Sequence, residues 1–321
     1  MDQKKLLFVI NPKAGRSVIK NELFEIIQIF SAEGYSVEVY PTQQAGDAER
    51  YIVEHGEMFD VIVCAGGDGT LDNSVAGVLR LEQMTGKRTP LGYIPCGSTN
   101  DFARSLLISR DPIEAARQIV SGKACSIDVG KLLEQYFIYV AAFGAFTDVS
   151  YSTPQNLKNT LGHAAYLLEA LRKIGKLTGY KLEVHFDGRV ATGEYVYGQI
   201  TNSKSVGGFP VIGSGSDMSF SDGEFECVFI RMPENPVQLQ RIINTLLLGE
   251  VNDDLILYER ASKIQVICQD VEVPWTIDGE FGGNYREMEV VNLQKAISVI
   301  LGDRTTYNIG KSFENEQKRL D

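Results

Sequence analysis

Short apolar runs alternate with amphipathic stretches over the first 128 residues, and this alternation sets the tightest limit on the fold. The strand-like runs are 6–10, 35–40, 60–66 and 91–97. The helical segments are 19–30, 47–55 and stretches that begin near Leu71, Asn100 and Asp111. Thr42 and Asp47 are candidate caps of the helix at 47–55. Because strands that alternate with helices form parallel βαβ units, the sequence predicts an open, doubly wound α/β domain over residues 1–128.

From about residue 129 the pattern changes to period-two alternation. Residues 180–203 alternate around Asp187-Gly188, which predicts a β-hairpin. Further strand-like runs continue to about residue 301, and the helical exception is roughly 157–178. We therefore predict a β-rich second domain over 129–302, arranged as a two-layer sandwich. The polar tail, 303–321, is either disordered or returns to the first domain.

The composition limits the class of protein. A net charge of −11 and a pI near 4.9 argue against a nucleic-acid-binding surface, which would be basic. The longest near-apolar stretch, 136–146, is about half of the roughly 20 residues that a membrane-spanning helix needs. The five cysteines are scattered and never spaced C-x-x-C, which fits reduced thiols and argues against a zinc site. We expect a cytoplasmic protein with no nucleic-acid partner.

Three loops of the predicted α/β domain share one design. They are "NPKAG" (11–15), "GGDGT" (66–70) and "PCGSTND" (95–101). Each follows a strand, contains glycine or other small residues and opens into a helix, whose N-terminal amides attract anions. Singly, each would be an ordinary turn between a strand and a helix. Because loops at the carboxyl ends of parallel strands lie along one edge of the sheet, the three together predict a nucleotide site.

The middle loop carries a carboxylate, Asp68, where a phosphate would be expected to bind. The chain has neither the lysine-containing P-loop, G-x-x-x-x-G-K-[ST], nor the G-x-G-x-x-G of dinucleotide-binding folds. A Mg²⁺ ion shared between Asp68 and the phosphate oxygens would supply the missing positive charge, since one or two carboxylates and substrate phosphates commonly hold Mg²⁺. Alternatively, Asp68 is a turn residue that accepts a local hydrogen bond.

The three loops, in this order, resemble those of the bacterial soluble diacylglycerol kinase family, whose wider group includes sphingosine and ceramide kinases. The segments "IDVGKL" (127–132), "FSDGEFECVFI" (220–230) and "TIDGE" (276–280) resemble later parts of the same family. The resemblance implies a nucleotide-binding α/β domain followed by a β-sandwich domain, with the ATP site in the cleft between them. It also implies a Mg²⁺-dependent transfer of the γ-phosphate of ATP to the hydroxyl of a lipid such as diacylglycerol, which gives phosphatidic acid.

The resemblance further implies roles for individual residues. Asp68 would hold Mg²⁺ beside the diphosphate, and a structural magnesium site would use Ser219, Asp222 and Glu224. Nucleotide contacts would come from Asn11, Pro12, Gly15, Thr42, Gly66, Gly67, Gly69, Thr70, Ser98, Asn100 and Asp101.

The catalytic acidic pair of the family matches Asp278 and Glu280. A lipid hydroxyl needs a base within hydrogen-bond reach, and none of the three histidines lies in a loop motif. A carboxylate is therefore the expected base, and we choose Glu280, with Asp278 orienting it or binding metal. Alternatively, Asp278-Gly279 is only another hairpin turn.

The chain departs from the family pattern at two places in its nucleotide loops. Thr99 stands where many members have the second glycine of G-T-G-N-D, and Asp72-Asn73 reverses the amide and the acid of "LNE". These changes support an alternative function, a nucleotide-binding regulatory protein without catalysis. A second alternative is an NAD kinase, because NAD kinases share "GGDGT".

Residues 157–181 form a basic, amphipathic stretch in an acidic chain. They contain five basic residues and one acidic residue, a local net charge of +4. Such a helix can lie on an anionic bilayer, so we expect peripheral contact with the inner face of the membrane. Alternatively, its apolar face packs on the sandwich and its lysines are only solvated. The sequence leaves open whether the chain forms a homodimer.

Overall fold

The computed structural model describes residues 3–14, 18–97, 100–144, 178–202, 205–206, 209–210, 219–248 and 254–302. The chain divides into two compact units. The first consists of Met1–Val129, Ser219–Asp222 and Gln294–Asp321, and the second of Gly130–Met218 and Gly223–Leu293. The basic stretch at 157–177 and the tail at 303–321 lie outside the described residues.

A parallel sheet forms the centre of the first unit. Its strands are β1 (Lys4–Ile10), β2 (Tyr35–Pro41), β3 (Val61–Gly66), β4 (Leu91–Pro95) and the end of β17 (Glu287–Leu301). They lie in the order β17-β4-β3-β1-β2 and pair in parallel throughout. β3 and β4 are buried along their whole length, as expected of apolar strands that are covered on both faces.

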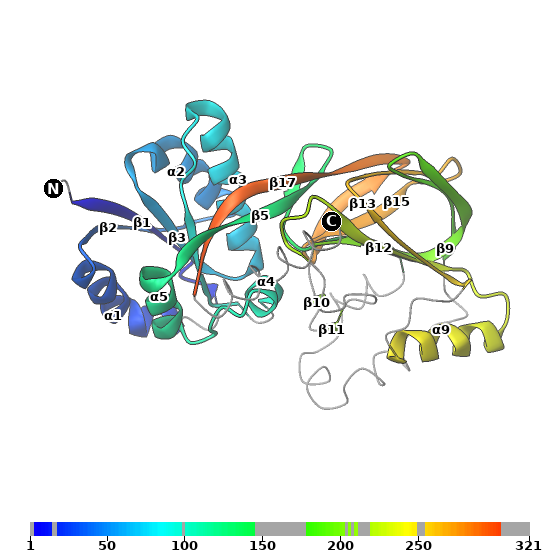
Figure 1. Ribbon diagram of the computed structural model, residues 1–321, viewed down its shortest axis with the longest axis horizontal. Helices are drawn as coiled ribbons and strands as arrows, with labels where there is room; N and C mark the ends of the chain where they lie inside the picture. Colours follow the sequence, from blue (N-terminus) through cyan, green and yellow to red (C-terminus); the bar gives the residue numbers. More distant parts are fainter. Residues whose placement is uncertain are drawn as a thin grey trace, which may run out of the picture. The chain divides into compact units, whose positions relative to one another are not determined.

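Helices cover both faces of this sheet. They are α1 (Val18–Ala32), α2 (Asp47–His55), the 3-10 helix η2 (Gly56–Met58), α3 (Asp68–Thr85), α4 (Asp101–Ser105) and α5 (Pro112–Ser121). α1 packs against α5 on one face, and α2 packs against α3 on the other (Figure 1). The predicted open, doubly wound α/β domain is confirmed.

The start of α3 differs from the prediction. The helix begins at Asp68 rather than near Leu71, because the N–H groups of Thr70 and Leu71 already bond to the carbonyl of Gly67. As a result, most of the "GGDGT" motif forms the first turn of a helix instead of a loop.

The predicted caps of α2 are wrong. Its N-cap is Gly46, which adopts the left-handed conformation with φ of 76° and makes no side-chain cap bond. Asp47 is the first residue of the helix and turns its carboxylate back toward the N–H group of Gln43. Thr42 lies further back, where its own N–H group donates to the carbonyl of Ile10.

The second unit is built mainly from antiparallel strands. They are β5 (Lys123–Leu132), β6 (Gln135–Phe137), β7 (Val140–Gly144), β8 (Tyr180–Phe186), β9 (Arg189–Thr201), β10 (Ser205–Val206), β11 (Phe209–Pro210), β12 (Phe225–Arg231), β13 (Ile256–Ala261), β14 (Lys263–Ile267), β15 (Val273–Ile277) and β16 (Glu280–Tyr285). The unit also holds α9 (Pro236–Leu248), while β5 and β17 each contribute residues to both units. One path of pairing runs β16-β15-β7-β9-β8-β14-β17.

The predicted hairpin at 180–203 is formed by β8 and β9. Asp187 and Gly188 occupy its turn, both with positive φ. The first half of β9 pairs with β8, and its second half lies between β7 and β12. Lys181, which the sequence placed at the end of the basic stretch, therefore lies on a strand.

Aromatic side chains fill the core of the second unit. The ring of Phe143 lies 4.9 Å from that of Trp275 and 6.0 Å from that of Phe229, and all three side chains are buried. Further apolar residues of β8, β9, β12, β14 and β17 pack around them. The predicted β-rich, sandwich-like domain is confirmed.

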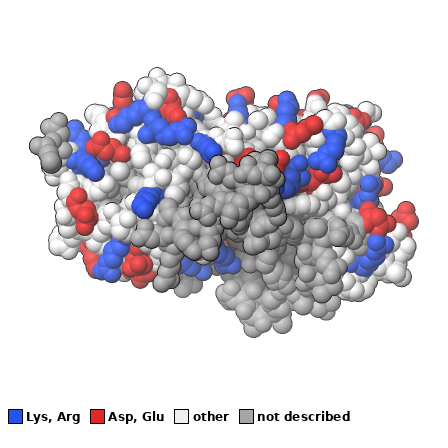
Figure 2. Space-filling view, in the orientation of Figure 1, with Lys and Arg blue, Asp and Glu red and all other residues white. Residues whose placement is uncertain are grey.

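Charged side chains of both signs lie on the surface of the molecule. Basic and acidic side chains lie interspersed over the face that Figure 2 shows, a distribution typical of globular domains. None of the helices in the described part of the chain is long and apolar enough to span a bilayer.

Candidate active site

Asn11 joins the first two predicted nucleotide loops. It follows β1, and its backbone N–H donates to the carbonyl of Ala65 at 2.8 Å. Its side-chain Nδ2 donates to the hydroxyl of Thr70 at 3.0 Å, while its Oδ1 accepts from the N–H of Lys13. The partly buried Pro12 follows in the same turn, and Gly15 lies outside the described residues. Asn11 therefore holds the loop after β1 against the start of α3.

The N-terminus of α3 begins in a tight glycine-containing turn, the cradle that the sequence predicted for phosphate. Gly67 is the N-cap and has no side chain with which to cap the helix, so the positive end of the helix dipole is not covered by a cap residue. A Cβ on Gly66 would lie 2.4 Å from the Cβ of Thr70, which means that the turn closes tightly on itself. Asn73 maintains this turn, because its Nδ2 donates to the carbonyl of Gly69 at 2.6 Å. In the reversed Asp72-Asn73 pair, the side-chain amide of Asn73 therefore stabilises the first turn of α3.

The loop after β4 meets this cradle backbone to backbone. A Cβ on Gly97 would lie 2.7 Å from the Cα of Gly67. The N–H of Cys96 donates to the carbonyl of Gly66 at 2.7 Å, which fixes the approach. Ser98 and Thr99 lie outside the described residues.

Asn100 fixes the end of the loop after β4 by hydrogen bonds. It adopts the left-handed conformation with φ of 51°, which asparagine tolerates better than most residues. Its backbone N–H donates to the Asp68 carboxylate at 3.1 Å. Its amide side chain exchanges two hydrogen bonds with the backbone of Gly97, at 2.9 and 2.8 Å. Asp68 and Asn100, predicted separately from two motifs, are therefore brought together.

Tyr93 is a residue of this site that sequence reasoning missed. Its hydroxyl lies 3.2 Å from the carbonyl of Gly66 and 3.3 Å from Oδ1 of Asn100, so it bridges two loops. Burial, together with the nearby charge of Asp68, raises the pKa of Tyr93 well above its ordinary value, which keeps the hydroxyl a donor. The signal in the sequence was a single phenol in the otherwise apolar run of β4.

The other described residues of the predicted nucleotide set, Thr42 and Asp101, follow the strands β2 and β4. The N–H of Thr42, just after β2, donates to the carbonyl of Ile10 at 2.8 Å, which places Thr42 beside the Asn11 loop. Asp101 is the first residue of α4 and is buried, with 1% of its surface exposed. The structure thus collects the described members of the predicted set along one edge of the sheet.

The residues around Asp68 fit a magnesium ion that phosphates would share. Mg²⁺ prefers hard oxygen ligands and is commonly held by one or two carboxylates, with substrate phosphates and water completing its shell. Asp68 supplies such a carboxylate at the start of α3, between the half-buried Gly67 and Gly69. Within the described ranges, no three His, Cys, Asp or Glu side chains form a metal-binding group.

In the second unit, Asp278 anchors a turn. Asp278-Gly279 connects β15 to β16, so the hairpin-turn interpretation is also correct for this pair. Asp278 is buried, and its carboxylate accepts hydrogen bonds from the consecutive N–H groups of residues 138–140 at 2.6, 3.0 and 2.8 Å. Glu280 begins β16 and is exposed. The two carboxylates therefore differ sharply in environment, although they stand two positions apart.

The residues proposed for a structural magnesium site divide between the two units. Ser219 and Asp222 belong to the first unit, where Ser219 is buried, and Glu224 belongs to the second. The Glu224 carboxylate lies 3.1 Å from the guanidinium of Arg260, which also approaches Glu226 at 3.8 Å. Magnesium binding by this set stays a prediction.

A second residue that sequence reasoning did not single out is Asp128. It is fully buried, and its Oδ1 accepts from the N–H of Lys295 at 2.6 Å. Its own N–H donates to the carbonyl of Phe220 at 2.8 Å. Asp128 therefore ties three separate segments of the first unit together, and only its place in "IDVGKL" marked it in the sequence.

Two family models match successive parts of the chain. Residues 5–132 match the diacylglycerol kinase catalytic domain. Residues 142–300 match the YegS C-terminal NAD kinase beta sandwich-like domain.

Relatives and solved structures match nearly the whole chain. The diacylglycerol kinase of Bacillus subtilis (strain 168) is 36% identical over 301 residues, covering 93% of this chain and 96% of that protein. The diacylglycerol kinase of Staphylococcus carnosus (strain TM300) is 31% identical over 302 residues, covering 92% and 95%. The crystal structure of a candidate diacylglycerol kinase from Bacillus anthracis (strain Sterne) superposes with a TM-score of 0.79 at 26% identity, covering 95% and 97%.

Proposed function

Since this chain belongs to the bacterial diacylglycerol kinase family, a family of lipid kinases, we propose that it transfers the γ-phosphate of ATP to the hydroxyl of diacylglycerol. The product would be phosphatidic acid. The observation that carries this proposal is the set of contacts that join three glycine-containing loops around one carboxylate, Asp68, through Asn11, Gly97 and Asn100.

In this proposal the first unit binds ATP mainly through its backbone. The start of α3, whose N-cap Gly67 makes no side-chain cap bond, would let phosphate oxygens approach peptide N–H groups closely. Mg²⁺, when bound at Asp68, would neutralise charge on the phosphates, which the absence of a P-loop lysine makes necessary. Asn11 and Asn100 would keep the loops in register while the nucleotide is bound.

Glu280 is our choice for the base that accepts the proton of the lipid hydroxyl. Its carboxylate is exposed, so it can receive a proton from a bound substrate. Asp278 is less suited to that role, because three backbone N–H groups already bind its buried carboxylate. Asp278 would instead hold the turn that presents Glu280.

A transfer assay with γ-labelled ATP tests the proposal. The acceptors are diacylglycerol, a sphingoid base and NAD, with and without EDTA, and the variants are Asp68→Asn and Glu280→Gln. Label on diacylglycerol that EDTA and both substitutions abolish would support the proposal. Label on NAD alone would assign an NAD kinase, and ATP binding without transfer to any acceptor would assign a regulatory protein. Glu272→Gln, an exposed carboxylate just before β15, is the matched control and should transfer normally.

We also propose that residues 157–181 bring the enzyme to an anionic membrane, where its lipid substrate resides. The support is their local net charge of +4 in a chain of net charge −11. Sedimentation with vesicles that contain or lack anionic lipid tests this. Reversing Arg172, Lys173 and Lys176 to Glu should abolish binding to the anionic vesicles, and binding that survives the reversal would contradict it.

A further inference from the structure

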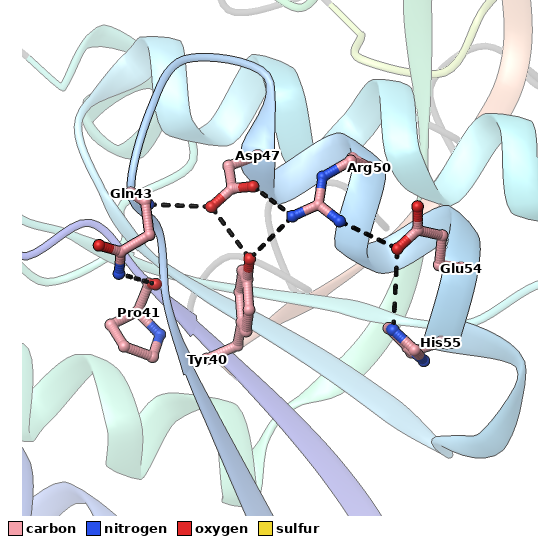
Figure 3. Close-up of polar contacts among 7 residues, drawn as sticks. All are labelled: Tyr40, Pro41, Gln43, Asp47, Arg50, Glu54 and His55. Carbon is pink, nitrogen blue, oxygen red and sulfur yellow. Dashed lines mark hydrogen bonds and ion pairs between the residues drawn. The ribbon is translucent and has the colours of Figure 1, made fainter.

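Asp47 is a buried carboxylate next to the nucleotide edge of the sheet, and no role assigned so far uses it. It is the first residue of α2, directly after the left-handed Gly46, and 3% of its surface is exposed. A buried carboxylate costs free energy unless its oxygens are hydrogen-bonded. Figure 3 shows that the side chain points into a cluster of polar groups from β2, the following loop and α2.

The bonds of Asp47 connect both ends of the loop between β2 and α2. Its Oδ2 accepts from the hydroxyl of Tyr40 at 3.0 Å and from the backbone N–H of Gln43 at 2.9 Å. Its Oδ1 accepts from Arg50, one helical turn further on, at 2.6 Å. One carboxylate thus fixes the last part of the strand, the middle of the loop and the first turn of the helix.

The partners of Asp47 are themselves fixed. The ring of Tyr40 stacks on that of Tyr51 at 3.6 Å with an interplanar angle of 14°, and the hydroxyl of Tyr51 donates to Glu38 at 2.7 Å. Arg50 also donates to Glu54 at 3.0 Å (Figure 3). The cluster therefore resists rotation of either side chain away from Asp47.

Thr42 is the residue that this arrangement positions. It stands between Tyr40 and Gln43, the two groups that Asp47 holds, and its N–H bonds to the carbonyl of Ile10 at the end of β1. The loop is therefore attached to β1 through the backbone of Thr42 and to α2 through the Asp47 side chain, besides the backbone bonds that Gln44 and Gly46 accept from Asp47 and Arg50. Without the Asp47 side chain, Tyr40 and Gln43 would lose the bonds that hold them to the start of α2.

We propose, on the basis of the function proposed above, that Asp47 is a positioning residue for ATP: it holds the loop after β2 so that Thr42 meets the nucleotide. Asp47 touches neither substrate in this role. Removing the Asp47 side chain should therefore weaken ATP binding, while the rate of the chemical step and the affinity for lipid stay nearly unchanged.

Steady-state kinetics and direct ATP binding to the full chain test the inference. For Asp47→Ala we expect KM for ATP and the dissociation constant of ATP to rise about tenfold, with kcat and KM for diacylglycerol within about twofold of wild type. Asp47→Asn keeps an acceptor oxygen for the N–H of Gln43 but loses the charge, so it should recover part of the affinity. Glu54→Gln removes the exposed partner of Arg50 and leaves Asp47 in place, so it is the matched control and should bind ATP normally.

The outcomes separate this inference from the proposed function. Unchanged ATP affinity in folded Asp47→Ala overturns the inference alone. If Asp47→Ala does not fold, Tyr40→Phe and Asp47→Asn test the inference instead, because each removes part of the hydrogen-bonded cluster. Unchanged ATP affinity in both of these variants overturns the inference. A wild-type protein that binds no ATP overturns the proposed function, and the inference falls with it.

Discussion

The backbone of Gly97 lies so close to that of Gly67 that a Cβ on Gly97 would stand 2.7 Å from the Gly67 Cα and 2.6 Å from Oδ1 of Asn100. Real Cβ atoms do not approach backbone atoms this closely, so one of the two loops would have to move. Movement is restricted because the N–H of Cys96 is bonded to the carbonyl of Gly66, in the residues directly before the two glycines. The two glycines therefore allow the loops after β3 and β4 to meet backbone to backbone.

Gly97→Ala should destabilise the first unit and weaken ATP binding. Overpacking of this kind costs about 2 kcal/mol of unfolding free energy, measurable by urea denaturation. The matched control is Gly67→Ala, whose Cβ would lie at an ordinary 3.4 Å from the Cα of Gly97 and should cost less than about 1 kcal/mol. Equal destabilisation by the two substitutions would contradict this account of the contact.

Replacing Asp278 should lower the stability of the protein, whereas replacing Glu280 should lower its activity. Asp278→Ala leaves three buried N–H groups without their acceptor and should lower the free energy of unfolding by about 3 kcal/mol. Glu280→Gln changes an exposed side chain, so stability should stay within about 0.5 kcal/mol of wild type while phosphate transfer falls about 100-fold. Urea denaturation and the transfer assay measure the two effects. Full transfer by folded Glu280→Gln would remove Glu280 from the chemistry.

The periodic parts of the fold could be predicted from the sequence, because each element carries its own pattern. Strands β1 to β4 and the hairpin at Asp187-Gly188 follow from spacing within a few residues. The pairing of Asn100 with Asp68 could not be predicted in the same way, because it joins residues 32 positions apart. It depends on β3 and β4 being neighbours in the sheet, which is a property of the whole unit.

Local rules misassigned the carboxylate of Asp47 and left the partners of the Asp278 carboxylate unpredicted. Cap preference pointed to Asp47 as a helix cap, but its oxygens turn back to Gln43 and Tyr40. Turn preference identified Asp278-Gly279 correctly, yet it gave no hint that the Asp278 carboxylate binds the backbone of residues 138–140. In both cases the side chain's role depends on a strand or loop that is brought near only by folding.

Thiol labelling should separate one cysteine from the other four. Cys64, Cys96, Cys227 and Cys268 are buried, and burial raises the pKa of Cys64 to about 12 and that of Cys96 to about 11. Thiolate is the reactive form, so these thiols should react negligibly with a disulfide reagent at pH 8 in the native protein. The partly exposed Cys125 should react first, and all five should react in urea. Rapid native labelling of Cys96 would show that the loop after β4 opens, contrary to the contacts described for Gly97.

The stability that Asp47 contributes should depend on pH in the acid range. The hydrogen bond from the N–H of Gln43 and that from Arg50 lower the pKa of Asp47 below its ordinary value of 3.8. A carboxyl whose pKa is lower in the folded state stabilises the fold above its unfolded pKa, and this contribution is lost as the pH falls through the folded value. The difference in unfolding free energy between wild type and Asp47→Asn should therefore be constant from neutral pH to about pH 5 and shrink below pH 3.8. Urea denaturation across this range measures the difference, and one that stayed constant down to the lowest pH at which the protein folds would mean that the charge on Asp47 does not support the loop.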